Sequence, residues 1–520
     1  MAGDDIPLLS KSRFTSGLQC SRKLYLSCFQ PDLGTPPDAA QQAVFDAGSL
    51  VGEIARDLRP GGVLVEEPYY LHDEAVARTR GLLTDKRVPA IYEAAFTEDG
   101  VRVRADILAR TSEGAWELIE VKSTMSAKKQ HIPDVAVQLM VIEKAGLTIE
   151  RVSLAHLSRD YAYTGGEYEA AQLLTIDDMT EDARAYTETI AGELAVMRDA
   201  LAGDEPPDIA IGPHCHKPYK CEFFAHCRAR EPYWSIEELP GLSPKKRTQL
   251  RDTGVRSILD IPDQTQLTAV QERARQSVVT GVAQRDASLE AELSKIVTPA
   301  HFIDFETLGP ALPIYPGTRP YETVPFQWSD HVLHQNGSVK HSEFLADGAD
   351  DPRADFVDSL VSQLQGAATV VVYSGYEETC LRGLQAELPD RSAALEELLD
   401  GRWVDLLRIV QGHYYHRDFH GSFSLKSVLP ALAPTVAYED LEIRGGMVAS
   451  NAYLESIKPE TSARRRKKLR RDLLAYCARD TQAMLLIIDA MRGRRAQQSG
   501  LASRLSRAVR GLWPFGASKT

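Results

Sequence analysis

The sequence predicts a mixed α/β protein of about three units, and three observations support this class. The chain has 520 residues, whereas one hydrophobic core normally serves about 150. Short segments that alternate in polarity, or are rich in β-branched residues, are followed by segments of helical periodicity, as expected for sheets covered by helices. Between residues 235 and 295 the sequence changes to short polar helices, so we expect a linker there. No internal repeat of roughly 20–50 residues is found.

Residues 1–232 are expected to form the first domain, with two neighbouring strands at its centre. The segments "VRVRADILAR" and "WELIEVKST" alternate in polarity and are joined by the turn-forming "TSEG", and the helical "DVAVQLMVIEKAG" follows. Asp106 lies in the first strand, and Glu120 and Lys122 share one face of the second. Carboxylates on neighbouring strands suit Mg²⁺ or Mn²⁺, and a lysine beside them can orient water. A surface hairpin with a cross-strand ion pair is the alternative for this pattern alone.

Four of the seven cysteines predict a second kind of metal site in this domain. Three recur at intervals of six within "HCHKPYKCEFFAHC" and one lies near the N-terminus: Cys20, Cys215, Cys221 and Cys227. Four thiolates suit a [4Fe-4S] cluster, or Zn²⁺ with the neighbouring histidines as further donors. Reduced free thiols are the alternative, and Cys28 is the second choice for the N-terminal ligand. Cys380 and Cys477 are expected to be packing residues.

Residues 233–296 are expected to form a small helical linker. The segment "LPGLSPKKRTQLRDTGVRSILDIP" predicts a helix, a tight turn at Gly254 and a second helix. This order resembles a helix-hairpin-helix module, whose turn usually offers backbone N–H groups to a phosphate. A short helical linker without a ligand is the alternative.

Residues 297–492 are expected to form a third domain that opens on the strand "HFIDFETLGP". Asp304 and Glu306 alternate with apolar residues, so both carboxylates point to one face of the strand. Two neighbouring carboxylates repel each other unless a cation neutralises them, and Mg²⁺ is the expected one. A buried strand with a capping acid is the alternative for these two residues alone.

Later elements of this domain carry further acids in a plausible order. Glu377 follows the buried strand "TVVVYSGY", and Asp405 lies in "WVDLL". Tyr476 and Asp480 are four residues apart in a strongly periodic helix, so they share one face. Four carboxylates, from residues 304, 306, 377 and 480, can converge on two Mg²⁺ ions about 4 Å apart, where Tyr476 would hold the attacking water.

The net charge of −13 conceals basic segments near the C-terminus. The run "ARRRKKLRR" holds seven basic residues between Arg464 and Arg471, and residues 493–520 form a tail without acids. Local patches bind phosphates whatever the total charge, although a solvated helix face and a disordered tail are the alternative. No apolar run approaches the ~20 residues that span a bilayer. The start "MAGDDIPLLSKSRF" lacks a secretory pattern, so we expect a cytoplasmic protein with no membrane partner.

The first domain resembles a known nuclease class in "YEAAF…RADILAR…WELIEVKS…Q", with "CSRKLYL" before it and the cysteine run after it. These features are similar to the PD-(D/E)xK restriction-endonuclease-like fold, in its RecB-like branch with the CRISPR-associated exonucleases. The resemblance implies that Asp106 and Glu120 bind metal, Lys122 is the catalytic lysine and Gln138 is the helix glutamine, with Glu93 assisting. It also favours iron–sulfur over zinc. The branch's usual early-helix histidine is absent from "GSLVGEIAR", where Glu53 is the nearest substitute, and the cysteine spacing is wider.

The third domain resembles the DEDD-type 3′–5′ exonucleases, which have an RNase H-like fold. The order D-x-E, acid, Y-x3-D matches the subclass with tyrosine in its last motif, and Glu377 stands where aspartate is usual. The resemblance implies catalytic roles for Asp304, Glu306, Glu377, Tyr476 and Asp480. From end to end the chain resembles the DUF2779 family, a RecB-like unit fused to an RNase H-like exonuclease unit.

These patterns predict a metal-dependent nuclease that hydrolyses phosphodiester bonds. Single-stranded DNA, rather than RNA, is the expected substrate, digested from its 3′ end at the C-terminal site, with a possible second nuclease site at the N-terminus. The alternative is a nucleic-acid-binding protein in which one or both sites are inactive and the Fe-S or Zn cluster is structural. A zinc-stabilised adaptor unrelated to nucleic acids is a third interpretation, which the basic run beside Asp480 disfavours.

Overall fold

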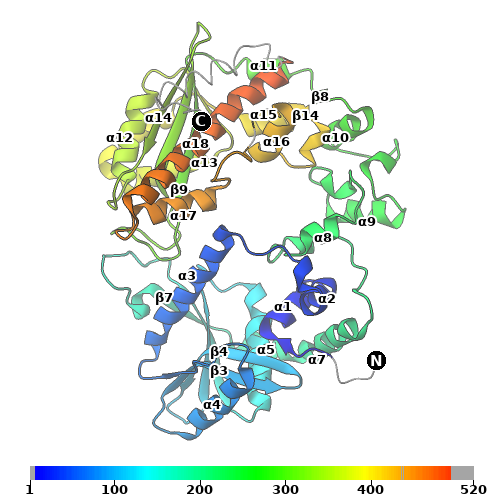
Figure 1. The fold of residues 1–520 in the computed structure, drawn as a ribbon, viewed down its shortest axis with the longest axis vertical. Helices are drawn as coiled ribbons and strands as arrows, with labels where there is room; N and C mark the ends of the chain where they lie inside the picture. Colours follow the sequence, from blue (N-terminus) through cyan, green and yellow to red (C-terminus); the bar gives the residue numbers. More distant parts are fainter. Residues whose placement is uncertain (1–5, 435, 437, 494–520) are drawn as a thin grey trace, which may run out of the picture. The chain divides into compact units, whose positions relative to one another are not determined.

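The computed structural model describes residues 6–493 except 435 and 437, and the chain divides into two compact units (Figure 1). Unit 1 comprises Met1–Arg230 and Pro310–Glu322, and unit 2 comprises Glu231–Gly309 and Thr323–Thr520. Each unit has a sheet that mixes parallel and antiparallel strands. The predicted mixed α/β class is therefore confirmed. The predicted basic tail lies outside the described residues from 494 onward.

The sheet of unit 1 has the strand order β2-β3-β4-β5-β6-β7, with β1 paired to β4. Its strands are β1 (Leu9–Ser10), β2 (Val63–Leu64), β3 (Ala90–Glu98), β4 (Val101–Arg110), β5 (Trp116–Lys122), β6 (Ile149–Leu157) and β7 (Leu174–Asp178). The two predicted strands are β4 and β5, which pair antiparallel at the middle of the sheet. Along the first half of β4 buried and part-exposed residues alternate, because successive side chains face opposite sides.

Helices cover both faces of this sheet. The helices of unit 1 are α1 (Lys11–Gln19), α2 (Ser21–Phe29), α3 (Ala39–Ala55), α4 (His72–Thr84), α5 (Ile132–Lys144), α6 (Ala170–Leu173), α7 (Thr180–Ala202) and α8 (Phe224–Arg228), with 3-10 turns η1 (Pro31–Leu33), η2 (Arg56–Leu58), η3 (Lys129–His131) and η4 (Pro213–Cys215). One core packs α1, α4, α5 and α7 against the sheet. A second core, on other sheet residues, contains side chains of α3, α6 and the 310–322 segment. Helix α5 is the helix predicted after the two strands.

Unit 2 begins with two similar helical hairpins, a repetition that the sequence analysis missed. In the first, the 3-10 turn η5 (Ile236–Glu238) precedes α9 (Pro244–Asp252), and in the second, η6 (Ile258–Asp260) precedes α10 (Ala269–Thr280). The hairpins exchange backbone hydrogen bonds reciprocally, from Ile236 N to Arg256 O at 2.9 Å and from Ile258 N to Trp234 O at 2.8 Å. The second α-helix predicted directly after Gly254 is wrong: η6 stands there. Ile261 precedes a proline and is extended, which ends the turn.

The main sheet of unit 2 has the order β11-β10-β9-β12-β13, and a small ladder pairs β14 with β8. The strands of unit 2, in both the sheet and the ladder, are β8 (Gln284–Arg285), β9 (Ala300–Leu308), β10 (Val324–Leu333), β11 (Val339–Leu345), β12 (Thr369–Val372), β13 (Trp403–Asp405) and β14 (Tyr414–Tyr415). Strand β9, which carries "HFIDFETLGP", lies between antiparallel β10 and parallel β12. The acids of this strand are therefore held in the middle of the sheet.

Helices of unit 2 lie on both sides of this sheet (Figure 1). They are α11 (Leu289–Leu293), α12 (Arg353–Leu364), α13 (Tyr376–Glu387), α14 (Ser392–Leu399), α15 (Leu406–His413), α16 (Leu425–Leu432), α17 (Gly446–Ile457) and α18 (Ala463–Met491), with the 3-10 turns η7 (Pro389–Arg391) and η8 (Arg417–Phe419). Ile303 and Phe305 of β9 pack into the core formed with α12, α13 and α14. The intervening acids, Asp304 and Glu306, face the opposite side, where α18 contacts β9 and β10.

Candidate metal centres

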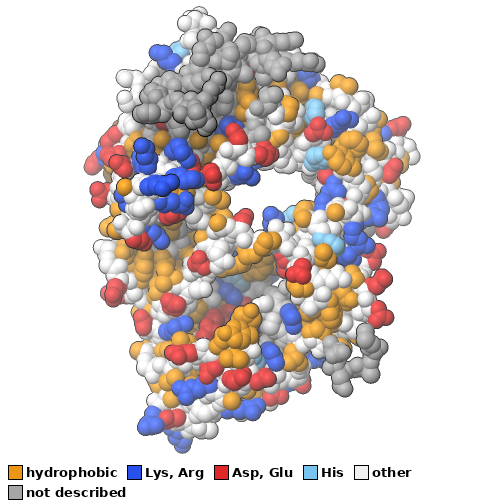
Figure 2. All heavy atoms as spheres, in the orientation of Figure 1, with side chains coloured by type: hydrophobic (Ala, Val, Ile, Leu, Met, Phe, Trp, Pro, Cys, Tyr) orange, Lys and Arg blue, Asp and Glu red, His pale blue; other side chains and the backbone are white. Residues whose placement is uncertain are grey.

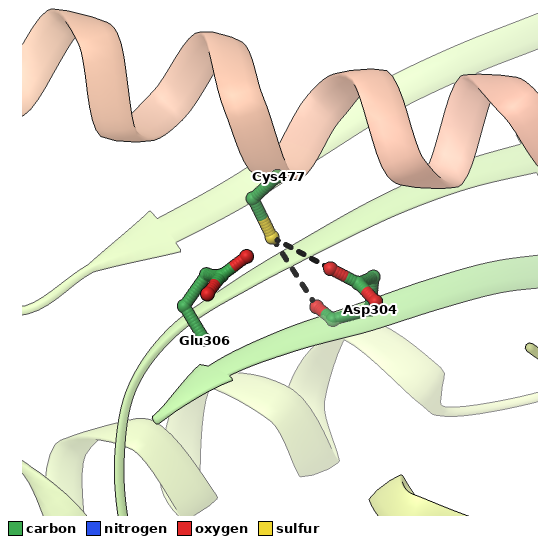
Figure 3. A group of neighbouring side chains, drawn as sticks. All are labelled: Asp304, Glu306 and Cys477. Carbon is green, nitrogen blue, oxygen red and sulfur yellow. Dashed lines mark hydrogen bonds between the residues drawn. The ribbon is translucent and has the colours of Figure 1, made fainter. Parts of the chain in front are cut away.

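The carboxylates of β9 lie directly beneath α18 in unit 2. Ligand atoms of Asp304, Glu306 and Cys477 all lie within 4.8 Å of one another, and Figure 3 shows the three side chains turned toward one point. Two ligand atoms bound to one ion at about 2.0–2.5 Å each lie at most about 4–5 Å apart. The donors therefore fit one divalent cation. Among the described residues this is the one set of three or more acid, cysteine or histidine donors with such spacing.

Glu377 and Asp480 come to the same cleft from two other elements. Glu377 lies in the first turn of α13 and Asp480 in the middle of α18, and both line an open cleft of about 490 Å³ together with Asp304. This volume is in the range typical of ligand sites, about 300–1,000 Å³. Glu377 is 4% exposed and its Oε2 makes no hydrogen bond. The structure thus brings together the four carboxylates that the sequence analysis selected.

The electrostatics of the cleft show an excess of negative charge. Burial, and next the charge of Asp480, raises the pKa of Asp304 well above its usual value. Burial also raises the pKa of Glu306 strongly and that of Glu377 to about 8. The pKa of Asp480 is about 6, because burial raises it while the hydrogen bond from Tyr438 and the charge of Lys426 lower it. The charge of a bound divalent cation would lower the pKa values of these carboxyl groups toward their usual range. Oxygen-rich sites of this kind suit Mg²⁺ or Mn²⁺.

Two tyrosines and a lysine complete the cleft. Tyr476, on α18, lines the cleft one helical turn from Asp480, and the two groups interact electrostatically. Tyr438, which the sequence analysis did not select, donates a hydrogen bond to Oδ1 of Asp480 from a separate loop. The Lys426 ammonium lies 5.4 Å from the centre of the Tyr476 ring. Asp405 instead caps α15, where it accepts from Arg408 N at 3.2 Å, and its charge helps to raise the pKa of buried Glu377.

The predicted site of unit 1 is assembled around Glu120. Asp106 and Glu120 come just beyond the last paired residues of β4 and β5, Ile107 and Ile119, so the strands part where the acids lie. One Asp106 oxygen accepts from Val121 N at 2.7 Å. Glu120 accepts from Lys122 Nζ at 2.6 Å and from Gln138 Nε2 at 2.8 Å. Gln138 is fully buried on α5. All four predicted residues are therefore neighbours.

Lys11, which the sequence analysis missed, also enters this site. Its Nζ lies 2.9 and 3.1 Å from the two oxygens of Glu120. Asp134 joins the network, with Oδ2 at 2.6 Å from Lys122 Nζ. Burial would raise the pKa of Glu120, but the charges of Lys11 and Lys122 hold it far below its usual value. Both oxygens of this expected metal ligand thus already contact ammonium groups of the chain.

The remaining expectations for unit 1 have mixed outcomes. Glu53 is exposed on α3, and no contact with the Glu120 network is found for it among the described residues. Glu93 takes a left-handed φ of 57° between Tyr92 and Ala94, which pair with β4 in one unshifted register, so it stands opposite Asp106. Burial, and next the charge of Glu120, raises the pKa of Asp106 to about 7, with Glu93 adding to the effect. The opposing positions of Glu93 and Asp106 on neighbouring strands therefore bring a third carboxylate toward Asp106.

The four predicted cysteine ligands line one small enclosed pocket in unit 1, beside Phe223 and Phe224. The Gln19 side chain ties the pocket's two chain segments together by donating to His214 O and Tyr219 O, each at 2.7 Å. No set of three thiols at single-ion spacing is found among the residues described, so the structure shows no zinc-like four-cysteine site. Four thiolates of a [4Fe-4S] cluster bind different irons, whereas one zinc ion requires close spacing. Cys28 packs against the main core instead.

The basic run predicted to hold phosphates forms the first turns of α18, where Figure 2 shows Lys and Arg side chains gathered on the surface. Some of these cationic side chains donate hydrogen bonds to backbone carbonyl oxygens of unit 2. Arg466 donates to Ser456 O at 2.7 Å and to Lys458 O at 3.0 Å. Arg470 donates to Ala346 O at 2.6 Å. Arg466 and Arg470 of the basic run therefore serve to hold unit 2 together.

Comparisons with known proteins give a partial match. Residues 301–424 match the family described as "Domain of unknown function (DUF2779)", and a search of curated proteins found no match. The solved structure titled "Crystal structure of SSO0001" is 14% identical, covers 37% of this chain and 78% of that chain, and has a TM-score of 0.19. The family B DNA polymerase from the hyperthermophilic archaeon Pyrobaculum calidifontis is 11% identical, covers 77% of this chain and 46% of that chain, and has a TM-score of 0.23. Both TM-scores are too low to assign a fold.

The search for membrane-crossing segments covered the described part of the chain. It found no helix with both the length and the apolar character that a bilayer span requires.

Proposed function

We propose that the chain is a metal-dependent nuclease that hydrolyses phosphodiester bonds, and that the cleft of unit 2 digests single-stranded DNA from its 3′ end. The observation that carries this proposal is the convergence of four carboxylates from β9, α13 and α18. Asp304, Glu377 and Asp480 line the cleft, and Glu306 lies beside Asp304. Against them, the described lining of the cleft offers one ammonium group, that of Lys426. The excess of negative charge suits two divalent cations. The family match at residues 301–424 includes three of the four acids.

The chain's own residues have distinct roles in this proposal. When bound, the cations supply the Lewis-acid charge that phosphodiester hydrolysis requires. Asp304, Glu306, Glu377 and Asp480 would hold them. Tyr476 lines the cleft beside Asp480, where its hydroxyl would orient the attacking water. Lys426 would face a phosphate, and the rings of Tyr376 and Phe423 in the lining offer surfaces on which unpaired bases can stack.

The test is a digestion assay with Mg²⁺ or Mn²⁺ on 3′- and 5′-labelled strands of DNA and RNA. We expect stepwise shortening from the 3′ end of DNA, lowered at least about 100-fold by Asp304→Asn, because even partners of metal ligands are worth 10–100-fold. Asp358→Asn is the matched control, since this acid pairs with Arg391 on the surface of the same unit. Equal activity of wild type and Asp304→Asn would reject the site.

A [4Fe-4S] cluster bound by Cys20, Cys215, Cys221 and Cys227 is a further part of the proposal. The shared pocket supports it, as does the position of Cys28 away from that pocket. Zn²⁺ is the alternative, with the neighbouring histidines as additional donors. Anaerobic purification followed by iron and zinc analysis and a visible absorption spectrum distinguishes the two. Iron without the cluster's absorption, or neither metal, would count against a cluster.

For unit 1, strand binding without cleavage is a second candidate function, and Lys11 is the observation that favours it. Its contact with both oxygens of Glu120 neutralises the carboxylate that a catalytic metal would need. A circular single strand, which has no 3′ end, separates the two functions. Linearisation that depends on Asp106 would show cleavage, whereas retention on the protein without linearisation would show binding alone.

A further inference from the structure

Cys477 lies in an environment that does not suit a packing cysteine. It is fully buried on α18, directly after Tyr476, and its Sγ is 3.5 Å from both the carbonyl oxygen and Oδ2 of Asp304. Figure 3 shows the sulfur pointing between the carboxylates of Asp304 and Glu306. Buried cysteines usually behave as small hydrophobic residues, and Cys380 does so in the apolar core of α12, α13 and α14. Cys477 is buried, as a packing residue would be, but packing alone does not account for its contacts with Asp304.

The positions of the three donors fit a shared ion. The Sγ and one oxygen of each acid all lie within 4.8 Å of one another, as ligands of one cation must. A separate observation also points to a cation at this place. Glu377 is 4% exposed, lines the same cleft and leaves its Oε2 without a hydrogen bond. The thiol therefore lies at the edge of a cleft in whose described lining the negative charges outnumber the single ammonium group, that of Lys426.

We propose that Cys477 is a sulfur ligand of the metal ion held by Asp304 and Glu306, and that it makes this position select a thiophilic divalent cation over Mg²⁺. The inference rests on the metal site of the proposed nuclease. On coordination a metal–sulfur bond replaces the S–H bond, and the proton leaves to solvent. Thiolate ligands favour metals such as Co²⁺, Zn²⁺ and Cd²⁺, whereas an all-oxygen site suits Mg²⁺.

The first test measures metal binding without turnover. Metal-free wild type, Cys477→Ser and the control Cys380→Ser are titrated with Co²⁺, and absorption is recorded for the band of a thiolate bound to Co²⁺. The four cysteines of unit 1 contribute equally to all three proteins, so the difference between wild type and Cys477→Ser isolates this site. We expect the spectrum of wild type minus that of Cys477→Ser to show the thiolate–Co²⁺ band. The spectrum of wild type minus that of Cys380→Ser should not show it. Asp304→Asn, which leaves the sulfur in place, should produce the same loss if both residues share the ion.

The second test compares nuclease rates with Cd²⁺ and with Mg²⁺. We expect Cys477→Ser and Cys477→Ala to lower the Cd²⁺ rate relative to the Mg²⁺ rate about tenfold or more. Cys380→Ser should leave this ratio unchanged. Mg²⁺-dependent activity with an unchanged ratio and no difference band would overturn the sulfur ligand while leaving the nuclease intact. If the wild type cleaves nothing with any metal, the nuclease proposal fails and the Co²⁺ difference spectrum still decides the role of Cys477.

Discussion

The hydroxyl of Tyr438 donates a hydrogen bond to Oδ1 of Asp480, so a loop tyrosine holds an acid of the central helix in place. Tyr438 is 6% exposed and Asp480 equally so. Asp480 itself belongs to α18. The hydrogen bond therefore ties its carboxylate to a second element, which is an arrangement that keeps a metal ligand in one orientation. Burial and the charge of Asp480 raise the pKa of the hydroxyls of Tyr438 and Tyr476, so they remain donors at neutral pH.

Replacing Tyr438 tests this support directly. Tyr438→Phe removes the hydroxyl and keeps the ring, so we expect roughly 10–100-fold weaker metal binding or activity. Tyr415→Phe is the control, because its buried hydroxyl accepts from Gly421 N at 2.9 Å elsewhere in unit 2. Calorimetric titration with Mn²⁺ and the digestion assay provide the measurements. If the two variants lose equal affinity, the effect belongs to general stability and not to Asp480.

The raised acid pKa values predict that the metal-free protein loses stability as pH rises. The pKa of Glu377 is about 8, against 4.5 for an ordinary glutamate. Between these values the folded state holds a proton that the unfolded state has released, so the free energy of unfolding falls with increasing pH. The melting temperature in chelator should fall by a few degrees between pH 5 and pH 8.

Added Mn²⁺ should stabilise the protein more at pH 8 than at pH 5, because at low pH protons compete with the metal. Glu377→Gln removes one titrating group and should flatten the dependence of melting temperature on pH. A melting temperature that rises with pH in chelator would contradict the raised pKa values.

The parts of the site that the sequence could predict depend on local periodicity. Asp304 and Glu306 share one face of a strand because successive strand residues point to opposite sides. Tyr476 and Asp480 share one face of a helix because residues four apart lie one turn from each other. These relationships hold whatever the rest of the chain does. The long-range convergence with Glu377 was predicted from the order of the acids along the chain, together with a family resemblance, and not from periodicity.

The residues that the sequence analysis missed make contacts which no local rule describes. Lys11 is separated from Glu120 by 109 positions, and Tyr438 from Asp480 by 42. A lysine at a helix start and a tyrosine in a loop are ordinary in composition, so their partners appear only in the tertiary structure. Cys477 was assigned to packing because its helix is apolar nearby, although it is next to Tyr476 and so close to the predicted metal site. The hairpin repetition was missed because η5 and η6 share capping and hydrogen bonding more than sequence.

Lys11 should compete with cations for Glu120. In Lys11→Met the two contacts to this carboxylate disappear, so we expect a lower melting temperature without metal, because a buried charge then loses part of its compensation. Mn²⁺ should restore stability in this variant more than in wild type. Lys144→Met, which breaks a surface pair with Asp99, is the control. Adding Asp106→Asn to Lys11→Met should reduce the gain from Mn²⁺ to that of wild type, because the cleft of unit 2 still binds the ion. An extra gain that persists would place the additional ion away from Asp106.

The basic run of α18 should contain two functional classes of cation. Arg464 and Lys467 are exposed in the first turns of the helix, whereas Arg466 is bound to two backbone carbonyls. Each phosphate contact contributes about −0.7 to the slope of log affinity against log salt for a single strand. If both exposed cations contact phosphate, the double variant Arg464→Ala, Lys467→Ala should lower the magnitude of this slope by about 1.4 and leave the melting temperature unchanged.

Arg466→Ala should show the opposite behaviour, with a lower melting temperature and nearly the same salt slope, because its donors serve Ser456 and Lys458. Fluorescence anisotropy of a labelled single strand at several salt concentrations, with Ca²⁺ in place of Mg²⁺ to limit cleavage, measures the slopes. An unchanged slope in the double variant would show that this face of α18 does not contact the strand. The phosphate contacts would then have to come from the cleft itself, where Lys426 lies near Tyr476.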